Sequence, residues 1–169
     1  AIGQTINEDE NQDIPSSSSL DQRFSDVVGE STFYLGENTF FDYKFSIDQN
    51  YEELNYNEID GNYSLGNTNF NISYLEKRNH IGKEENLKTG FDITIDDSSK
   101  FAFETKRNLL TDSAEFYNLS YEYLNDCLKA GIVFRREFYT DRDIEPDNSI
   151  MFTISILPFG DVGSPKISK

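Results

Sequence analysis

The only histidine of the chain, His80, lies in a polar stretch with no cysteine nearby. A structural zinc site needs four Cys or His ligands, so we expect no metal here. Neither a G-x-S-x-G nucleophile turn nor a glycine motif for phosphate occurs in the sequence. Carboxylate pairs are frequent, but 31 acidic residues among 169 make chance pairs inevitable. The residue types therefore predict neither an enzyme nor a cofactor.

One stretch repeats an acidic residue at every second position, at Asp141, Asp143, Glu145 and Asp147. An EF-hand calcium loop begins in this way, but it has glycine at its sixth position and glutamate at its twelfth. Pro146 and Phe152 occupy those positions here. We therefore expect a solvated loop rather than a dedicated calcium site.

Cys127 is the only cysteine, so the chain cannot form an internal disulfide. In an exported protein an odd cysteine indicates either a partner outside the chain or a free thiol. Both readings stay open from the residue type alone.

Most of the chain alternates apolar and polar residues with period two, which predicts half-buried strands rather than helices. In residues 41–48 the aromatic residues and Ile47 share one face, while the charged residues and Ser46 share the other. A strand that crosses a bilayer at a tilt needs roughly 9 to 11 residues, and the predicted segments are near that length. We predict nine strands, at residues 24–35, 39–48, 53–65, 68–79, 87–96, 100–110, 114–124, 128–139 and 149–159.

Short turns and long charged loops alternate along this series, with residues 48–52 and 111–113 as shorter members of the long-loop set. The short turns are residues 36–38, 66–67, 97–99 and 125–126, and the long loops are residues 1–23, 80–86 and 140–148. In outer-membrane barrels short turns face the periplasm and long loops face outside. The alternation predicts an antiparallel up-and-down meander with Cys127 at its short-turn end.

The net charge of −16 and the pI near 4.3 argue against binding nucleic acid through a basic face. Mean hydropathy is −0.63, yet 14% of the residues are aromatic. This combination fits a barrel with one apolar face and aromatic rims, and it also fits a soluble β-sandwich. No window approaches the roughly 20 consecutive apolar residues of a transmembrane helix, which excludes a helical membrane protein.

Two stretches resemble a known family. The run YEYLNDCLKAGIVFRREFYTDRDIEPDNSIMFTISILPFG, residues 121–160, resembles the C-terminal end of the outer-membrane lipopolysaccharide-assembly proteins. This family is LptD, also called organic solvent tolerance protein. The stretch IPSSSSLDQRFSDVVG, residues 14–29, is similar to the segment that introduces the last barrel strands of alphaproteobacterial members.

The resemblance implies that this chain is the C-terminal arc of a larger transmembrane β-barrel in the outer membrane of a Gram-negative cell. The implied function is lipopolysaccharide transport into the outer leaflet, without catalysis. The implied partners are lipopolysaccharide, outer-membrane lipids, the plug lipoprotein LptE and the family's N-terminal periplasmic domain. That domain and a signal peptide are missing from this sequence, so we expect a fragment.

The resemblance also implies roles for individual residues. Cys127 matches the barrel cysteine that is disulfide-bonded to the periplasmic domain, and Leu128 stands where some members have a second cysteine. A free thiol at a strand end is the alternative.

In the family the last strand meets the first at a seam thought to open sideways for lipid release. The resemblance places Phe152, Ile154, Ile156 and Pro158 in that strand. Pro158 cannot donate a ladder hydrogen bond, so it would weaken the seam or simply end the strand.

We expect a polar mobile loop or tail at residues 1–23, barrel strands at 24–160 and a C-terminal tail at 161–169. Two other functions remain open. A passive porin-like or adhesin-like barrel would show the same alternation. A soluble β-barrel or sandwich that binds a lipid would turn its apolar face inward.

Overall fold

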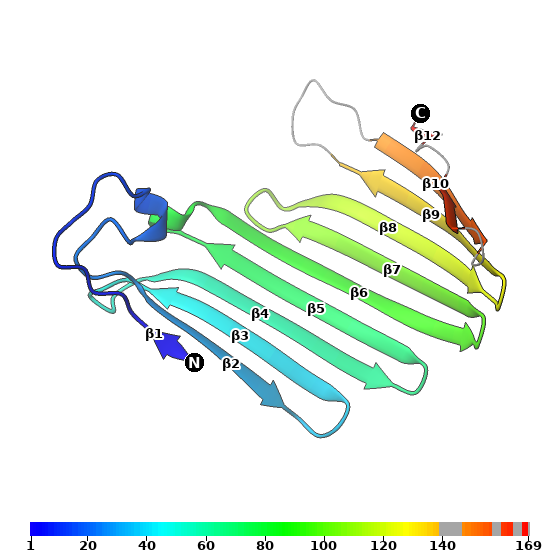
Figure 1. The fold of residues 1–169 in the computed structure, drawn as a ribbon, viewed down its shortest axis with the longest axis horizontal. Helices are drawn as coiled ribbons and strands as arrows, with labels where there is room; N and C mark the ends of the chain where they lie inside the picture. The colour runs from blue at the N-terminus through cyan, green and yellow to red at the C-terminus, as the bar shows by residue number, and fades with distance from the viewer. Residues whose placement is uncertain (139–146, 157–159, 164–166, 169) are drawn as a thin grey trace. The chain divides into compact units, whose positions relative to one another are not determined.

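The computed structural model describes residues 1–138, 147–156, 160–163 and 167–168, the last two ranges without their side chains. All nine predicted strands are present (Figure 1). They are β2 (Val27–Tyr34), β3 (Thr39–Ile47), β4 (Leu54–Leu65), β5 (Thr68–Lys77), β6 (Glu84–Asp96), β7 (Ser99–Asn108), β8 (Ser113–Leu124), β9 (Leu128–Glu137) and β10 (Asp147–Ile156).

Three short strands and two 3-10 turns accompany them. The strands are β1 (Ile2–Gly3), β11 (Gly160–Gly163) and β12 (Ile167–Ser168), and the turns are η1 (Ser16–Ser18) and η2 (Asn79–Ile81). Each strand neighbours the next in the order β1 to β11, and β12 also pairs with β10. The predicted all-β antiparallel meander is therefore confirmed.

The chain divides into two compact units, which we describe separately. Unit 1 comprises residues 1–62 and 72–87, and unit 2 comprises residues 63–71 and 88–169. In unit 1, β2 pairs with β3 from Val27↔Ile47 to Tyr34↔Phe40. In unit 2, the strands from β7 to β10 pair in continuous registers.

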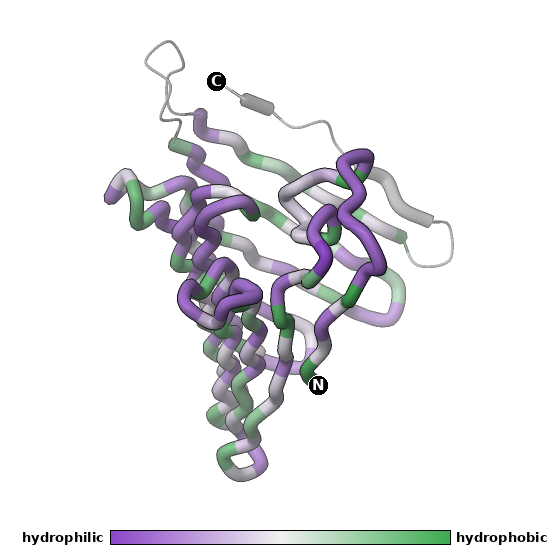
Figure 2. Tube along the Cα trace, turned by 90° about the vertical axis from the view of Figure 1, so that its left-hand side faces the viewer, coloured by the Kyte–Doolittle hydropathy of each residue, from purple (hydrophilic) through white to green (hydrophobic). Residues whose placement is uncertain are grey.

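These registers align residues of one kind across neighbouring strands. One row crosses β7 to β10 through Phe101, Tyr121, Ile132 and Phe152. A row on the opposite face runs through Glu104, Asn118, Arg135 and Ser149. Figure 2 shows the alternation as a change of colour along the strands. Each strand thus has an apolar face, which carries the first row, and a polar face, which carries the second.

Burial is inverted relative to a water-soluble protein. Among the described residues no hydrophobic side chain is fully buried, and the buried residues are polar or charged. Large apolar residues of the strands, such as Phe33, Phe70 and Phe152, are exposed. A contiguous apolar surface of this kind needs a nonpolar environment to cover it.

Three details refine the sequence prediction. Strand β6 begins at Glu84, three residues before its predicted start, because Glu84 pairs with Lys77 of β5 and extends the ladder. Residues 1–23 contain β1, η1 and several backbone hydrogen bonds, and their mobility stays a prediction. Pro158 and most of the acidic loop 140–148 lie outside the described residues.

The close contact at Gly90 in β6 provides a test of the strand packing. A Cβ atom there would lie 2.7 Å from the backbone oxygen of Phe103 and 2.9 Å from Asn71 Oδ1. Gly90→Ala should therefore destabilise the barrel by about 1–3 kcal/mol, because backbone atoms would have to move. The measurement is the denaturant midpoint of the full-length protein refolded in lipid vesicles.

The matched control is Gly3→Ala in β1, where a new Cβ meets nothing within 4 Å. We expect it to change the free energy of unfolding by less than about 0.5 kcal/mol. Equal midpoints for the two variants would contradict the packing described here.

Candidate functional site

The polar faces carry cross-strand ion pairs. Every lysine in a described strand lies within 3.1 Å of a carboxylate on a neighbouring strand. The pairs are Lys44–Glu58 and Lys77–Glu84 in unit 1, and Lys88–Glu104, Lys100–Asp92, Lys106–Glu115 and Lys129–Glu122 in unit 2. Such partly exposed pairs each contribute only about 0–1 kcal/mol. Their main consequence is a hydrated surface whose charges are already balanced in part.

The apolar face of unit 2 carries a continuous series of aromatic contacts. Neighbouring ring centroids lie 5.4 to 6.4 Å apart, in the order Tyr63, Phe70, Phe91, Phe103, Tyr117 and Phe138. The series crosses from β4 to the end of β9, one strand at a time. Aromatic residues on an outward face are typical of the membrane rims of a barrel.

Cys127 lies in the short β8–β9 turn, at the strand end that the turn pattern predicted. The side-chain oxygen of Asn125 accepts hydrogen bonds from the backbone N–H of Cys127 (3.0 Å) and of Leu128 (2.8 Å). The thiol is exposed and unpaired within the chain. The thiol is therefore accessible at the end of the strands, and the interdomain disulfide stays a prediction.

The predicted seam residues Phe152, Ile154 and Ile156 lie on the apolar face of β10 and are 44–50% exposed. They pair with β9, and β11 and β12 pair with the other edge of β10. Their assignment to a lateral seam stays a prediction.

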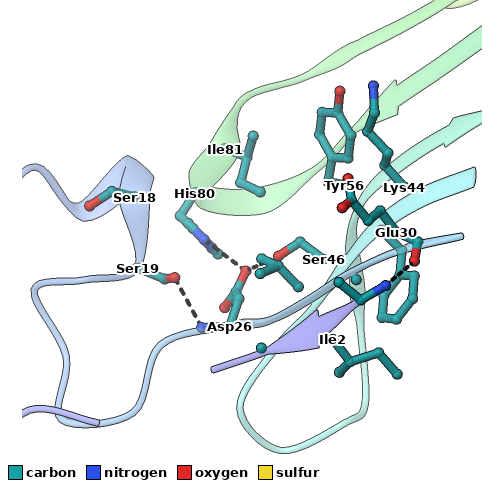
Figure 3. A pocket seen from close by; sticks show the side chains of 15 residues that line it. Ile2, Ser18, Ser19, Asp26, Glu30, Lys44, Ser46, Tyr56, His80 and Ile81 are labelled. Atoms are coloured by element: carbon teal, nitrogen blue, oxygen red, sulfur yellow. Dashed lines mark hydrogen bonds and ion pairs between the residues drawn. The ribbon is translucent and has the colours of Figure 1, made fainter. Parts of the chain in front are cut away.

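A buried polar cluster in unit 1 was not predicted from the sequence. Asp26 is 6% exposed, and its Oδ2 accepts hydrogen bonds of 2.8 Å from Ser46 Oγ and from Asn55 Nδ2. His80 Nε2 lies 3.2 Å from the same oxygen, near enough for an ion pair when the imidazole is protonated, though not aligned for a hydrogen bond. We call these four residues the Asp26 cluster, and Figure 3 labels three of them, Asp26, Ser46 and His80.

The Asp26 cluster joins four segments. Asp26 precedes β2, Ser46 is near the end of β3, Asn55 is near the start of β4, and His80 is in η2. All four lie at the long-loop end of their strands. His80 is only partly exposed, because its imidazole packs against the carboxylate of Asp26 in this cluster.

A cavity of about 610 Å³ opens beside the Asp26 cluster. Residues of the polar face form one wall, including Glu30 and Lys44, and η2 and the end of η1 contribute Ile81 and Ser18 (Figure 3). No group of three His, Cys, Asp or Glu residues suited to a metal ion occurs in the part of the chain that the structure describes.

The next loop at this end is also organised by a carboxylate. Hydrogen bonds from the backbone N–H of Glu53, and those of Asn50 and Glu52, hold the pKa of Asp48 below its ordinary value. A deprotonated Asp48 therefore closes the β3–β4 loop at neutral pH.

An antiparallel meander with an exposed apolar face and an ion-paired polar face defines the wall of an outer-membrane β-barrel. Among the described residues no helix is long and apolar enough to cross a membrane. A family model described as "LPS transport system D", LptD, matches residues 1–125. The chain belongs to the LptD family, a lipopolysaccharide-transport family of the outer membrane.

The family match includes residues 14–29 and ends within residues 121–160, the other stretch that carried the resemblance. It leaves the alphaproteobacterial type as a prediction. A comparison with curated protein sequences returned no match.

Two neighbouring residues of β9 test which face meets lipid. Ile132 lies on the apolar face and Val133 on the polar face. In lipid vesicles, Ile132→Arg should destabilise the full-length protein by about 2–4 kcal/mol, because the charge would enter the hydrocarbon. Val133→Arg should cost far less, because its side chain would remain hydrated. Equal losses of stability, measured by denaturant unfolding, would contradict the assignment of the faces.

Proposed function

We propose that this chain forms part of the barrel wall through which lipopolysaccharide reaches the outer leaflet of the outer membrane. The inverted burial carries this proposal, because it gives the strands one face suited to lipid and one suited to a polar cargo. The polar faces line the passage of the head group. The protein performs no bond-making chemistry in this role.

The ion pairs of the polar face suit a passage for a sugar-rich head group. Balanced charges do not hold a polar cargo tightly, while exposed carboxylates and ammonium groups can exchange hydrogen bonds with its hydroxyl groups. Tight binding would slow release. A partly neutralised, hydrated wall therefore favours movement over retention.

The partners follow from the same assignment. LptE occupies the lumen and contacts the polar faces, and outer-membrane lipids cover the apolar faces. The periplasmic domain of the parent protein forms a disulfide with Cys127. This pairing is supported by the exposure of the thiol and by its place in a short turn.

The release of the acyl chains is assigned to a seam that includes β10. Phe152, Ile154 and Ile156 give β10 an apolar face along which the acyl chains can move. Pro158 has no backbone N–H, so it cannot donate a ladder hydrogen bond at the seam. The exposure of the three apolar side chains supports this assignment.

The alternatives are less well supported. A soluble lipid-binding barrel would bury its apolar face, whereas the described part of the chain has no buried hydrophobic residue. A passive porin would have the same faces, but the LptD family match favours lipopolysaccharide transport.

The disulfide can be tested in the full-length protein in native outer membranes. We expect a difference between non-reducing and reducing gel mobility that disappears in Cys127→Ser. Adding Leu128→Cys to that variant should restore the difference, because the adjacent residue ends the same turn. The amount of lipopolysaccharide delivered to the cell surface should rise and fall with the fraction of the protein that carries the disulfide.

If Cys127→Ser has the same gel mobility as the wild type under both non-reducing and reducing conditions, the thiol has no such partner. Normal surface delivery in cells depleted of the protein would contradict the transport function itself.

A further inference from the structure

Residues 4–25 fold back on themselves as a hairpin, which we call the strap. Backbone N–H groups of Asn7, Asn11 and Ser25 donate to the carbonyl oxygens of Arg23, Asp21 and Thr5 at 2.8 to 3.0 Å. Ile6 and Phe24 form an isolated antiparallel bridge between the two arms. The strap thus has a defined path over the end of unit 1.

The strap lies beside residues of the polar face, and Phe45 of the apolar face also reaches the cavity between them. Ser18 and Ser19 of the strap line the cavity together with Lys44 and Ser46 of β3 and Tyr56 of β4 (Figure 3). Lys44 and Ser46 belong to the face that carries the ion pairs. The turn η1 also contacts η2, which closes the far side of the cavity.

Hydrophobic contacts contribute little to holding the strap. Three of its four large apolar residues, Ile6, Leu20 and Phe24, are 66%, 38% and 40% exposed, and Ile14 is half-buried. The buried residues at its C-terminal end are polar instead, Ser19 and Ser25 together with Asp26. The attachment therefore depends on hydrogen bonds and charge.

Those hydrogen bonds converge on Asp26. Its backbone N–H donates to Ser19 Oγ at 3.0 Å, and Ser25 Oγ donates to the carbonyl oxygen of Asp26 at 2.9 Å. Its carboxylate meets Ser46, Asn55 and His80, which belong to three other segments. Asn79 extends the attachment by donating to Asn55 Oδ1 and Glu53 Oε2, each at 2.7 Å.

We propose that the strap is a latched cover over the long-loop end of the polar face, and that the Asp26 cluster is its latch. With the latch closed, the strap covers the cavity and the strand ends beside it. Loss of the carboxylate charge releases the strap while leaving the strand ladder in place. The further statement that this cover closes the outer mouth of the passage rests on the proposed function.

The latch can be tested by proteolysis, because Arg23 is the only lysine or arginine in residues 4–25. Its carbonyl oxygen accepts a hydrogen bond from the backbone N–H of Asn7 in the closed strap. Trypsin can therefore cleave after Arg23 only when the strap is open. In the full-length protein in detergent micelles, Asp26→Asn should speed cleavage after Arg23 by about tenfold or more, because a buried charged acceptor is lost.

Two further variants keep this test decisive. His80→Ala leaves the carboxylate in place and removes one contact, so it should speed cleavage by a smaller factor. Asp13→Asn changes an exposed carboxylate of the strap outside the cluster and should leave the rate unchanged. Equal cleavage rates for the wild type, Asp26→Asn and Asp13→Asn would overturn the latch.

A second readout tests the cover. Cells that carry Asp26→Asn should admit a large polar dye faster than wild-type or Asp13→Asn cells, while lipopolysaccharide still reaches their surface. Faster cleavage without faster dye entry would overturn the role as a cover. If the proposed transport function is wrong, lipopolysaccharide will reach the surface normally in cells that lack the protein. The cleavage comparison would still test the latch in that case.

Discussion

The structure depends on satisfying backbone hydrogen bonds where water is absent. In the hydrocarbon of a bilayer every unpaired N–H or C=O costs several kcal/mol, so strands must pair along their whole length. The ladders from β7 to β10 meet this requirement over about ten residues each. Once those registers are set, period two sends alternate side chains to opposite faces. The apolar face and the ion-paired face are both consequences of this pairing.

The two ends of the strands meet different requirements. At the short-turn end, Asn125 organises the turn that contains Cys127 through its side-chain oxygen and its backbone N–H, which donates to the carbonyl oxygen of Leu128. At the long-loop end of unit 1, segments distant in sequence must be held together in water. Asp26 does this with one carboxylate because a buried acceptor with several donors is costly to leave unpaired. The strap and the cavity beneath it follow from that arrangement.

The nine strands could be predicted because one-sided exposure leaves a period-two pattern within each segment, as residues 41–48 illustrate. The place of Cys127 followed from the alternation of turn lengths. The start of β6 was missed because Glu84 is polar and is held in the strand by its ion pair with Lys77, a residue of β5. The Asp26 cluster was missed for the same reason: no local pattern relates positions 26, 46, 55 and 80. Pairings between distant polar residues need the fold before they can be recognised.

The most direct test of the two-faced wall is a nitroxide scan along β10, one cysteine at a time, in full-length Cys127→Ser protein in lipid bilayers. Accessibility to oxygen should peak at Ile150, Phe152 and Ile154, because oxygen concentrates in the hydrocarbon. Accessibility to a water-soluble nickel complex should peak at Met151, Thr153 and Ser155. Out-of-phase profiles with period two would support the account. Profiles without that period, or with the two sets exchanged, would contradict it.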